Sequence, residues 1–236
     1  MAPAQRTYVL VHGAWHGGWV WRDVAPALAA RGHRVTTPTL TGLGERRHTL
    51  NREVDLDTHV EDIVAHIEMN DLGDVDLVGW SYGGMVTTGV LARVPERIRS
   101  MIYLDAFVPE NGKALADYVD PDTRTFFEQA RAADQTMPSI PFEVFGVKDP
   151  KAIEFIAPRL VNQSWRTFFQ PAKAPARRPD IPYTYVRCLG FDPSPFIYFH
   201  GEMKKDPKVR TFELDTSHTC MVTDPKSVIG ILAEAP

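Results

Sequence analysis

Apolar residues along the chain follow two alternating patterns. Short runs of aliphatic and β-branched residues, typical of buried strands, occur at 7–12, 33–40, 75–78, 97–107, 183–188 and 209–214. Between them lie segments with apolar residues three or four apart, typical of amphipathic helices, at 21–31, 57–70, 85–93, 194–205 and 224–233. For the helix over 57–70, Asp57 or Thr58 is the predicted cap, with Glu61 completing a capping box on Thr58. Strands that alternate with helices predict an α/β fold around a parallel sheet.

Residues 109–180 interrupt this alternation. Prolines and large aromatic residues are frequent there, on what we expect to be short helical segments. So many large apolar residues are unusual in a disordered linker. We therefore predict a helical cap over 109–180, inserted into a core formed by 1–108 and 181–236. The length of 236 residues fits a single α/β domain overall.

The segment VDLVGWSYGGMV at 75–86 has the features of a nucleophile elbow. Its GxSxG motif places Ser81 between Gly79 and Gly83, at the point where a predicted strand gives way to a predicted helix. Glycines allow such a turn to close around a serine in a strained conformation. Ser81 is therefore the candidate nucleophile, and the backbone N–H of Tyr82 is a candidate oxyanion donor at the helix N-terminus.

A glycine-rich loop, GAWHGGW at 13–19, follows the first predicted strand. Backbone N–H groups of such a loop can point into a cleft, so we expect the Ala14 N–H to be the second oxyanion donor. His12 and His16 are four residues apart, which is a spacing that metal ligands use on a helix. Here they flank a glycine loop without a carboxylate or cysteine to complete a set, so we predict no metal and expect them to orient the loop.

His218 is the candidate general base. It follows the last predicted strand, and the loops at the carboxyl ends of parallel strands meet along one edge of a sheet. Ser81, Ala14 and His218 are therefore expected to lie together. The remaining candidates, His33, His59, His66 and His200, fall at strand starts or within helices, where a packed or solvated histidine is the usual finding.

Charge and composition exclude several classes of function. The net charge of −4 and the absence of a dense basic run argue against a nucleic-acid surface. There is no apolar run of 18 residues and no apolar signal region before residue 7, so we expect no membrane partner and a cytoplasmic location. Cys188 and Cys220 are expected to be reduced. Homodimer formation is left open.

Three segments, VLVHGAWHGGW, GWSYGG and ELDTSH, resemble the α/β-hydrolase superfamily, in particular the branch of plant methyl esterases and hydroxynitrile lyases. The chain is also similar to bacterial esterases and carbamate hydrolases of that branch, through its YLDAFVPE segment at 103–110. The resemblance covers almost the whole chain. It implies an eight-stranded, mostly parallel sheet, a Ser-His-acid triad and no cofactor.

The triad acid is the point at which the chain departs from its plant relatives. Their acid stands three residues beyond a cysteine that matches Cys188, which in this chain is Phe191. Asp192 is one residue further on. Asp105 stands at the end of the strand after the nucleophile helix, where other α/β hydrolases such as haloalkane dehalogenases are similar in carrying their acid. We favour Asp105, with Asp192 as the alternative and Asp215 as a third, less favoured candidate.

These features predict a serine hydrolase that cleaves small, apolar or aromatic carboxylic esters through an acyl-enzyme. Carbamate or amide hydrolysis would use the same groups and stays an alternative. Hydroxynitrile lyases resemble this chain but have a threonine and a lysine where it has Gly13 and Thr219, which argues against lyase activity. A slow small-molecule receptor is the remaining alternative.

Four aromatic residues are expected to contact the substrate: Trp15, Trp80, Phe126 and Trp165. Aromatic side chains near the elbow and in the cap suggest a compact apolar pocket. The competing interpretation is that the tryptophans pack the core.

Overall fold

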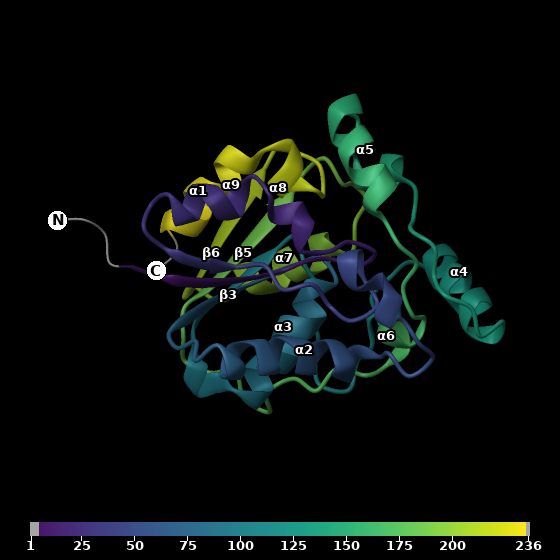
Figure 1. The fold of residues 1–236 in the computed structure, drawn as a ribbon, viewed down its shortest axis with the longest axis horizontal. Helices are drawn as coiled ribbons and strands as arrows, with labels where there is room; N and C mark the ends of the chain where they lie inside the picture. Colours follow the sequence, from purple (N-terminus) through teal and green to yellow (C-terminus); the bar gives the residue numbers. More distant parts are fainter. Residues whose placement is uncertain (1–4, 235–236) are drawn as a thin grey trace.

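A six-stranded parallel sheet runs through the computed structural model, which describes residues 5–234 (Figure 1). The strand order is β2-β1-β3-β4-β5-β6. The strands are β1 (Thr7–Val11), β2 (Arg34–Thr36), β3 (Val75–Trp80), β4 (Ile98–Leu104), β5 (Tyr183–Cys188) and β6 (Val209–Leu214). The predicted α/β fold is confirmed, but the expected eight strands are six. The six match the six strand-like runs of the sequence, whereas the number eight came only from the resemblance.

Helices cover both faces of the sheet because side chains on each strand alternate between the faces. Val9 and Val11 belong to one core, with α2 (Leu56–Met69), α3 (Gly83–Arg93) and α7 (Phe196–Lys204). Tyr8 and Leu10 belong to the other, with α1 (Val24–Ala29), α8 (Cys220–Thr223) and α9 (Pro225–Glu234). Figure 1 shows α1, α8 and α9 together above the sheet and α2 and α3 below it.

The strand order reverses at β1, which pairs with β2 on one side and with β3 on the other. At such a reversal the loops that follow the two central strands diverge to opposite faces and leave a crevice at the carboxyl edge. Val11 is in register with Gly79, and Trp80 with Leu104. The glycine loop after β1, Ser81 after β3 and Asp105 after β4 are thereby brought to neighbouring positions.

Two predicted boundaries are corrected. The helix expected at 57–70 begins at Leu56, because Asp55 caps it by accepting from the Thr58 N–H at 2.9 Å, and Thr58 Oγ1 in turn accepts from the Asp55 N–H. Glu61 takes no part in that capping box; it pairs with Arg93. The strand expected at 33–40 stops at Thr36, two residues before Pro38, which has no N–H to pair.

The segment between β4 and β5 contains short helices joined by irregular backbone. It contains α4 (Pro121–Ala132), α5 (Pro150–Ile156) and α6 (Arg166–Phe169), and Met137 pairs with Gln163 in an isolated antiparallel bridge. In Figure 1, α4 and α5 stand off from the sheet at one side of the molecule. The 3₁₀ turns of the chain are Gly18–Trp21, Gly44–Thr49, Pro95–Arg97, Leu115–Asp117, Phe142–Phe145 and Ala157–Arg159.

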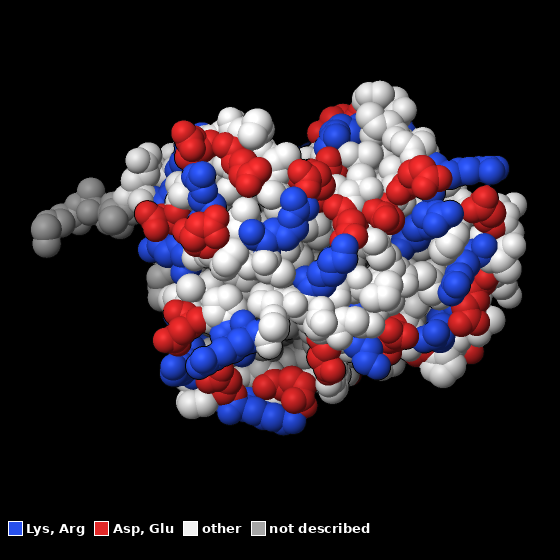
Figure 2. All heavy atoms as spheres, turned by 90° about the horizontal axis from the view of Figure 1, so that it is seen from below, with Lys and Arg blue, Asp and Glu red and all other residues white. Residues whose placement is uncertain are grey.

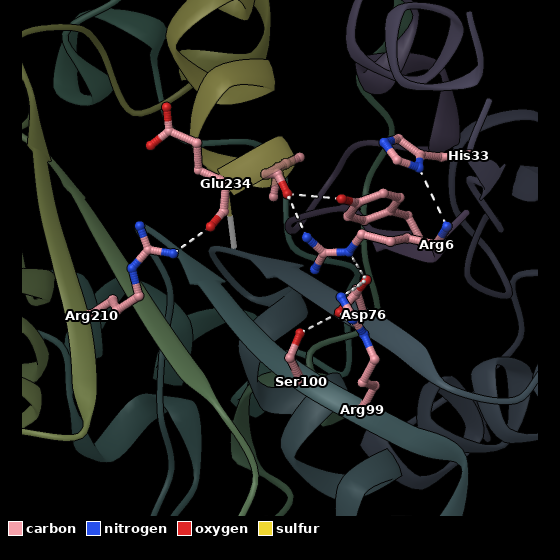
Figure 3. Close-up of polar contacts among 9 residues, drawn as sticks. Arg6, His33, Asp76, Arg99, Ser100, Arg210 and Glu234 are labelled. Carbon is pink, nitrogen blue, oxygen red and sulfur yellow. Dashed lines mark hydrogen bonds and ion pairs between the residues drawn. The ribbon is translucent and has the colours of Figure 1, made fainter. Parts of the chain in front are cut away.

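A buried ionic network ties the amino ends of the strands together (Figure 3). Asp76 on β3 is fully buried and accepts from Arg6 Nε at 2.7 Å, Arg99 Nη2 at 2.9 Å and Ser100 Oγ at 2.5 Å. The Tyr8 hydroxyl donates to Leu232 O at 2.8 Å, which attaches α9 to the same end. A buried carboxylate needs such partners. The network therefore connects the amino ends of the strands, at the end of the sheet opposite to Ser81.

The surface carries interspersed charges. On the face shown in Figure 2, acidic and basic side chains alternate without a large single-sign patch. Among residues 5–234, no helix combines the length and apolar character needed to cross a bilayer.

Candidate active site

Ser81 occupies a strained turn between β3 and α3. Its φ of 55° lies in the left-handed region, which is unfavourable for a residue with a side chain. The two glycines of the motif, Gly79 and Gly83, are required because neighbouring atoms leave no room for a side chain at either position. A Cβ on Gly79 would lie 2.5 Å from Thr87 Oγ1, and one on Gly83 would lie 2.8 Å from the carbonyl oxygens of Val11 and His12. The strained turn expected from the motif is therefore present.

His218 and Asp105 form a buried pair. His218 Nδ1 lies 2.7 Å from Asp105 Oδ2, and a carboxylate can only accept, so Nδ1 carries the proton and Nε2 is left as an acceptor. The other carboxylate oxygen, Oδ1, accepts from the Cys188 N–H at 3.0 Å. Asp105 also has a positive φ, 44°, and its N–H donates to Val186 O at 2.6 Å. Both side chains are thus fixed relative to the sheet.

The imidazole of His218 is enclosed by aromatic rings. Its backbone N–H donates to Phe145 O at 3.0 Å, and its carbonyl accepts from Trp80 Nε1–H at 2.9 Å. Phe196 stacks on the ring with centroids 5.1 Å apart and an interplanar angle of 13°. Rings of Trp80, Phe145 and Phe191 lie at 5.2, 5.3 and 5.1 Å. This enclosure leaves the ring one orientation.

The other two candidate acids are placed differently. Asp192 is 61% exposed and lies 3.6 Å from Arg187 Nη2. Asp215 is exposed on the loop before His218. Within the described part of the chain, Asp105 is the one of the three whose carboxylate is hydrogen-bonded to His218.

Ser81 and His218 line the same cavity, which has a volume of about 120 Å³. Ala14 and Tyr82 line it too, and within residues 5–234 neither backbone N–H has a protein acceptor. No hydrogen bond joins Ser81 Oγ to His218 Nε2 in this part of the chain; such contacts commonly tighten only when substrate binds. The structure therefore brings together the predicted nucleophile, base, acid and both predicted N–H donors.

The loop that carries Ala14 is held by two buried neutral histidines. His12 Nδ1–H donates to Gly13 O at 2.8 Å while its Nε2 accepts from the Leu40 N–H, and burial lowers the pKa of His12 to about 4. His16 Nδ1–H donates to Ala14 O at 2.6 Å, and burial lowers its pKa to about 3. Both therefore act as hydrogen-bonding supports. Within residues 5–234, no cluster of three or more His, Cys, Asp or Glu residues is arranged to hold a metal ion.

The four expected substrate contacts are not brought together. Trp15 lines the cavity. Trp80 does not line it and donates to His218 O, Trp165 donates to Asp134 Oδ1 at 3.0 Å, and Phe126 is partly exposed on α4. The apolar lining comes largely from other residues: Phe107, Leu115, Val119, Phe127, Ile140, Val144, Phe145, Phe168, Phe191 and Phe196. The aromatic enrichment of 109–180 pointed to the region, but which ring faces inward depends on how the short helices pack.

Comparison with known proteins gives the family. A family model described as the alpha/beta hydrolase family matches residues 8–230. The carbendazim hydrolyzing esterase of Nocardioides sp. (strain SG-4G) is 41% identical over 237 residues, covering 96% of this chain and 98% of the relative. The alpha-hydroxynitrile lyase of Arabidopsis thaliana is 31% identical over 114 residues, which is 48% of this chain and 44% of that protein.

Solved structures of alpha/beta hydrolases have the same fold as this chain. An extracellular alpha/beta-hydrolase from a Paenibacillus species, described as sharing structural and functional homology with tobacco salicylic acid binding protein 2, superimposes with a TM-score of 0.83 at 25% identity, covering 98% of each chain. Polyneuridine aldehyde esterase superimposes with a TM-score of 0.76 at 21% identity, over 98% of this chain and 99% of that one, which shows the shared fold. The chain therefore belongs to the alpha/beta hydrolase family, and the relatives it matches include proteins named as esterases and hydrolases.

Proposed function

We propose that the protein is a serine esterase that hydrolyses small, uncharged carboxylic esters with an apolar or aromatic group. Ser81 is the nucleophile, His218 the general base and Asp105 the acid. The observation that carries this proposal is the buried hydrogen bond between His218 Nδ1 and Asp105, in a cavity that also contains Ser81 on its strained turn. A proton on Nδ1 leaves Nε2 able to accept the serine proton.

The reaction follows from these positions. Nε2 of His218 accepts the proton of Ser81 Oγ as the oxygen attacks the ester carbonyl, and the N–H groups of Ala14 and Tyr82 stabilise the oxyanion. His218 then protonates the leaving alcohol. Water, activated by His218 in the same way, hydrolyses the acyl-enzyme and restores Ser81. Asp105 stabilises the imidazolium in both steps.

The cavity supports a compact neutral substrate. A volume of about 120 Å³ is similar to that of an apolar cavity that holds one benzene molecule, roughly 150 Å³. Its lining is mostly aromatic and aliphatic and includes no lysine or arginine among the described residues, with Asp120 as a carboxylate. Residues 109–180 supply much of this lining, which is why we propose that they act as a cap on the core of 1–108 and 181–236.

The lyase alternative is disfavoured by contacts. A threonine in place of Gly13 has no room, because a Cβ there would lie 2.9 Å from Trp80 Cε3 and 3.0 Å from Ser81 Cβ. Thr219 is bonded to Ser217 Oγ at 3.1 Å and does not line the cavity. The two positions that distinguish lyases are thus occupied otherwise. The other alternative, a small-molecule receptor, would bind the ester but hydrolyse it only slowly, which turnover of simple aryl esters at stoichiometric and at catalytic enzyme distinguishes from an esterase.

Carbendazim hydrolysis is the second candidate activity, favoured by the 41% identical relative named for it. Carbamate and amide hydrolysis would use the same acyl-transfer groups. A panel of methyl esters, aryl esters, methyl carbamates, anilides and carbendazim ranks these possibilities.

The nucleophile is tested with Ser81→Ala. Loss of the nucleophile costs on the order of a millionfold in kcat in a Ser-His-acid hydrolase. We expect a serine-directed phosphonate to label Ser81 and abolish activity, and a chelator to leave it unchanged. Full activity in Ser81→Ala, or inactivation by the chelator, would contradict the proposal.

A further inference from the structure

Trp15, the residue after the candidate oxyanion donor Ala14, is bound to the inserted segment through all three of its polar groups. Its N–H donates to Gln163 Oε1 at 2.9 Å, and its indole Nε1–H donates to Met137 O at 3.1 Å. Its carbonyl accepts from the Val161 N–H at 3.1 Å. Gln163 is 148 residues away along the sequence, so this is a tertiary contact between the loop after β1 and the segment between β4 and β5.

The conformation of Trp15 needs such support. Its φ is 63°, in the left-handed region that a bulky side chain disfavours. Residues held in such conformations persist only where surrounding contacts fix them. The three bonds from the inserted segment are those contacts.

Ala14 lies between two anchored peptide groups. On one side the Gly13 carbonyl accepts from His12 Nδ1–H at 2.8 Å, and on the other the Trp15 N–H is held by Gln163. The Ala14 N–H lies in the plane of the first peptide, and the backbone of Ala14 joins that plane to the second peptide, which is held at the Trp15 N–H by Gln163 and at the Ala14 carbonyl by His16. Release of the Trp15 anchor would let the loop relax and turn the Ala14 N–H away from the cavity.

Gln163 is itself fixed as an acceptor. It is 1% exposed, and its Nε2 donates to Thr167 Oγ1 at 2.8 Å. The Thr167 hydroxyl donates its own proton to Ser164 O at 2.7 Å, so it accepts from the amide, which leaves Gln163 Oε1 facing Trp15. Two backbone bonds with Met137, at 2.7 and 2.9 Å, hold the main chain. Gln163 does not line the cavity, so it cannot act on the substrate directly.

We propose that Gln163 is a positioning residue that holds the Ala14 N–H in the oxyanion hole by accepting from the Trp15 N–H. The inserted segment then builds part of the catalytic machinery in addition to lining the cavity. This inference rests on the proposed function, because it assigns Gln163 a role in the same acyl transfer.

Three substitutions separate positioning from a purely structural role. Gln163→Met keeps the length of the side chain but removes the acceptor. Gln163→Glu keeps the acceptor, with the Thr167 hydroxyl free to rotate and donate to the carboxylate, although a buried charge lowers stability. Asn162→Met makes a comparable change at the exposed neighbouring position and serves as the control.

The readouts are kcat and KM on an aryl ester and on the matching thionoester. Sulfur accepts hydrogen bonds weakly, so the preference for the ester over the thionoester reports contacts to the oxyanion. For Gln163→Met we expect kcat to fall about 10- to 100-fold with KM unchanged and the ester preference to shrink, because a donor displaced by about 1 Å can cost about 100-fold. Gln163→Glu should stay within a few-fold of the unmodified protein in kcat despite lower thermal stability, and Asn162→Met should match the unmodified protein.

Two results would overturn the inference. One is an unchanged kcat and ester preference in Gln163→Met. The other is an equal fall of kcat in Gln163→Met and Gln163→Glu that parallels their loss of thermal stability. Ser81→Ala is assayed alongside. An inactive Ser81→Ala with an unchanged Gln163→Met removes the positioning role alone, whereas a fully active Ser81→Ala removes the proposed function and the positioning role with it.

Discussion

Backbone strain at single residues marks the site. Trp15, Ser81 and Asp105 have φ values of 63°, 55° and 44°, and they follow β1, β3 and β4 respectively. Left-handed conformations are tolerated by aspartate in turns but are unfavourable for tryptophan and serine. Of the six residues other than glycine that have a positive φ within residues 5–234, these three lie at adjacent strand ends, as expected where a site needs fixed geometry more than local stability.

The choice of triad acid is a prediction at this scale. Replacement of Asp105 by asparagine keeps the shape but offers an N–H to His218 Nδ1, which favours the wrong tautomer and costs on the order of ten-thousandfold in kcat. We expect Asp105→Asn to show a loss of that size. Asp192→Asn, at an exposed position beside Arg187, should lose less than about tenfold. Steady-state kinetics of the two variants decide the matter, and the opposite ranking would move the acid to Asp192.

At the scale of elements, the short helices of the inserted segment determine which rings face the cavity. On α4, Phe127 is 2% exposed, lines the cavity and packs on Phe168 with centroids 4.9 Å apart. Its neighbour Phe126 is 36% exposed and lies outside the lining. Consecutive positions on a helix point in directions about 100° apart, so the two rings have different surroundings although they are adjacent in sequence.

This pair gives a matched test of specificity. Phe127→Leu enlarges the cavity, so we expect the ratio of kcat/KM for a bulky aryl ester to that for a short acetyl ester to rise several-fold. Phe126→Leu should leave the ratio unchanged. Rates on the two esters, together with thermal unfolding of both variants, make the comparison. A Phe127→Leu variant that loses stability without any change in the ratio would show that Phe127 only packs the segment.

At the scale of the whole molecule, the two ends of the sheet have different roles. The carboxyl ends of β1, β3, β4 and β6 are followed by the loops that hold Ala14, Ser81, Asp105 and His218. The amino ends are tied by Asp76 with Arg6, Arg99 and Ser100 (Figure 3). The parallel topology separates the strained site from the network that supports the opposite end.

The stability of the molecule should fall in acid because of its buried histidines. The pKa of His12 is about 4 and that of His16 about 3 in the folded protein, against 6.5 for an unfolded chain, with burial as the main cause. Between pH 7 and pH 5 the unfolded state therefore binds protons that the folded state does not. Each histidine removes about 2 kcal/mol of unfolding free energy over that range.

Denaturant unfolding at pH 7 and pH 5 measures this loss. His16→Phe, which cannot titrate and can pack between Trp19 and Trp80, should lose about 2 kcal/mol less over the same pH interval. His48→Phe, at an exposed position, should show the full loss of the unmodified protein. If the unfolding free energies of the unmodified protein, His16→Phe and His48→Phe depend equally on pH, His16 does not contribute to the loss of stability in acid.

The sequence alone determined the six strands, the α/β class and the position of Ser81, because these depend on local rules: hydrophobic period, glycine spacing and strand-to-helix turns. Local rules also indicated His218, from the order of the strands. The number of strands inferred from the resemblance was wrong because it did not come from this chain's own pattern.

Tertiary structure decided what depends on distance across the fold. The sequence favoured Asp105 over Asp192 and Asp215, but it did not show which carboxylate contacts His218, since the bond between Asp105 and His218 joins residues 113 apart in sequence and depends on how β4 lies relative to the last loop. The sequence likewise could not predict which rings face the cavity or that Gln163 anchors Trp15. Short helices and irregular turns carry no periodic signal for the direction of a side chain. The local pattern indicates which segments form strands, and only the packing of distant segments determines which residues meet at the strand ends.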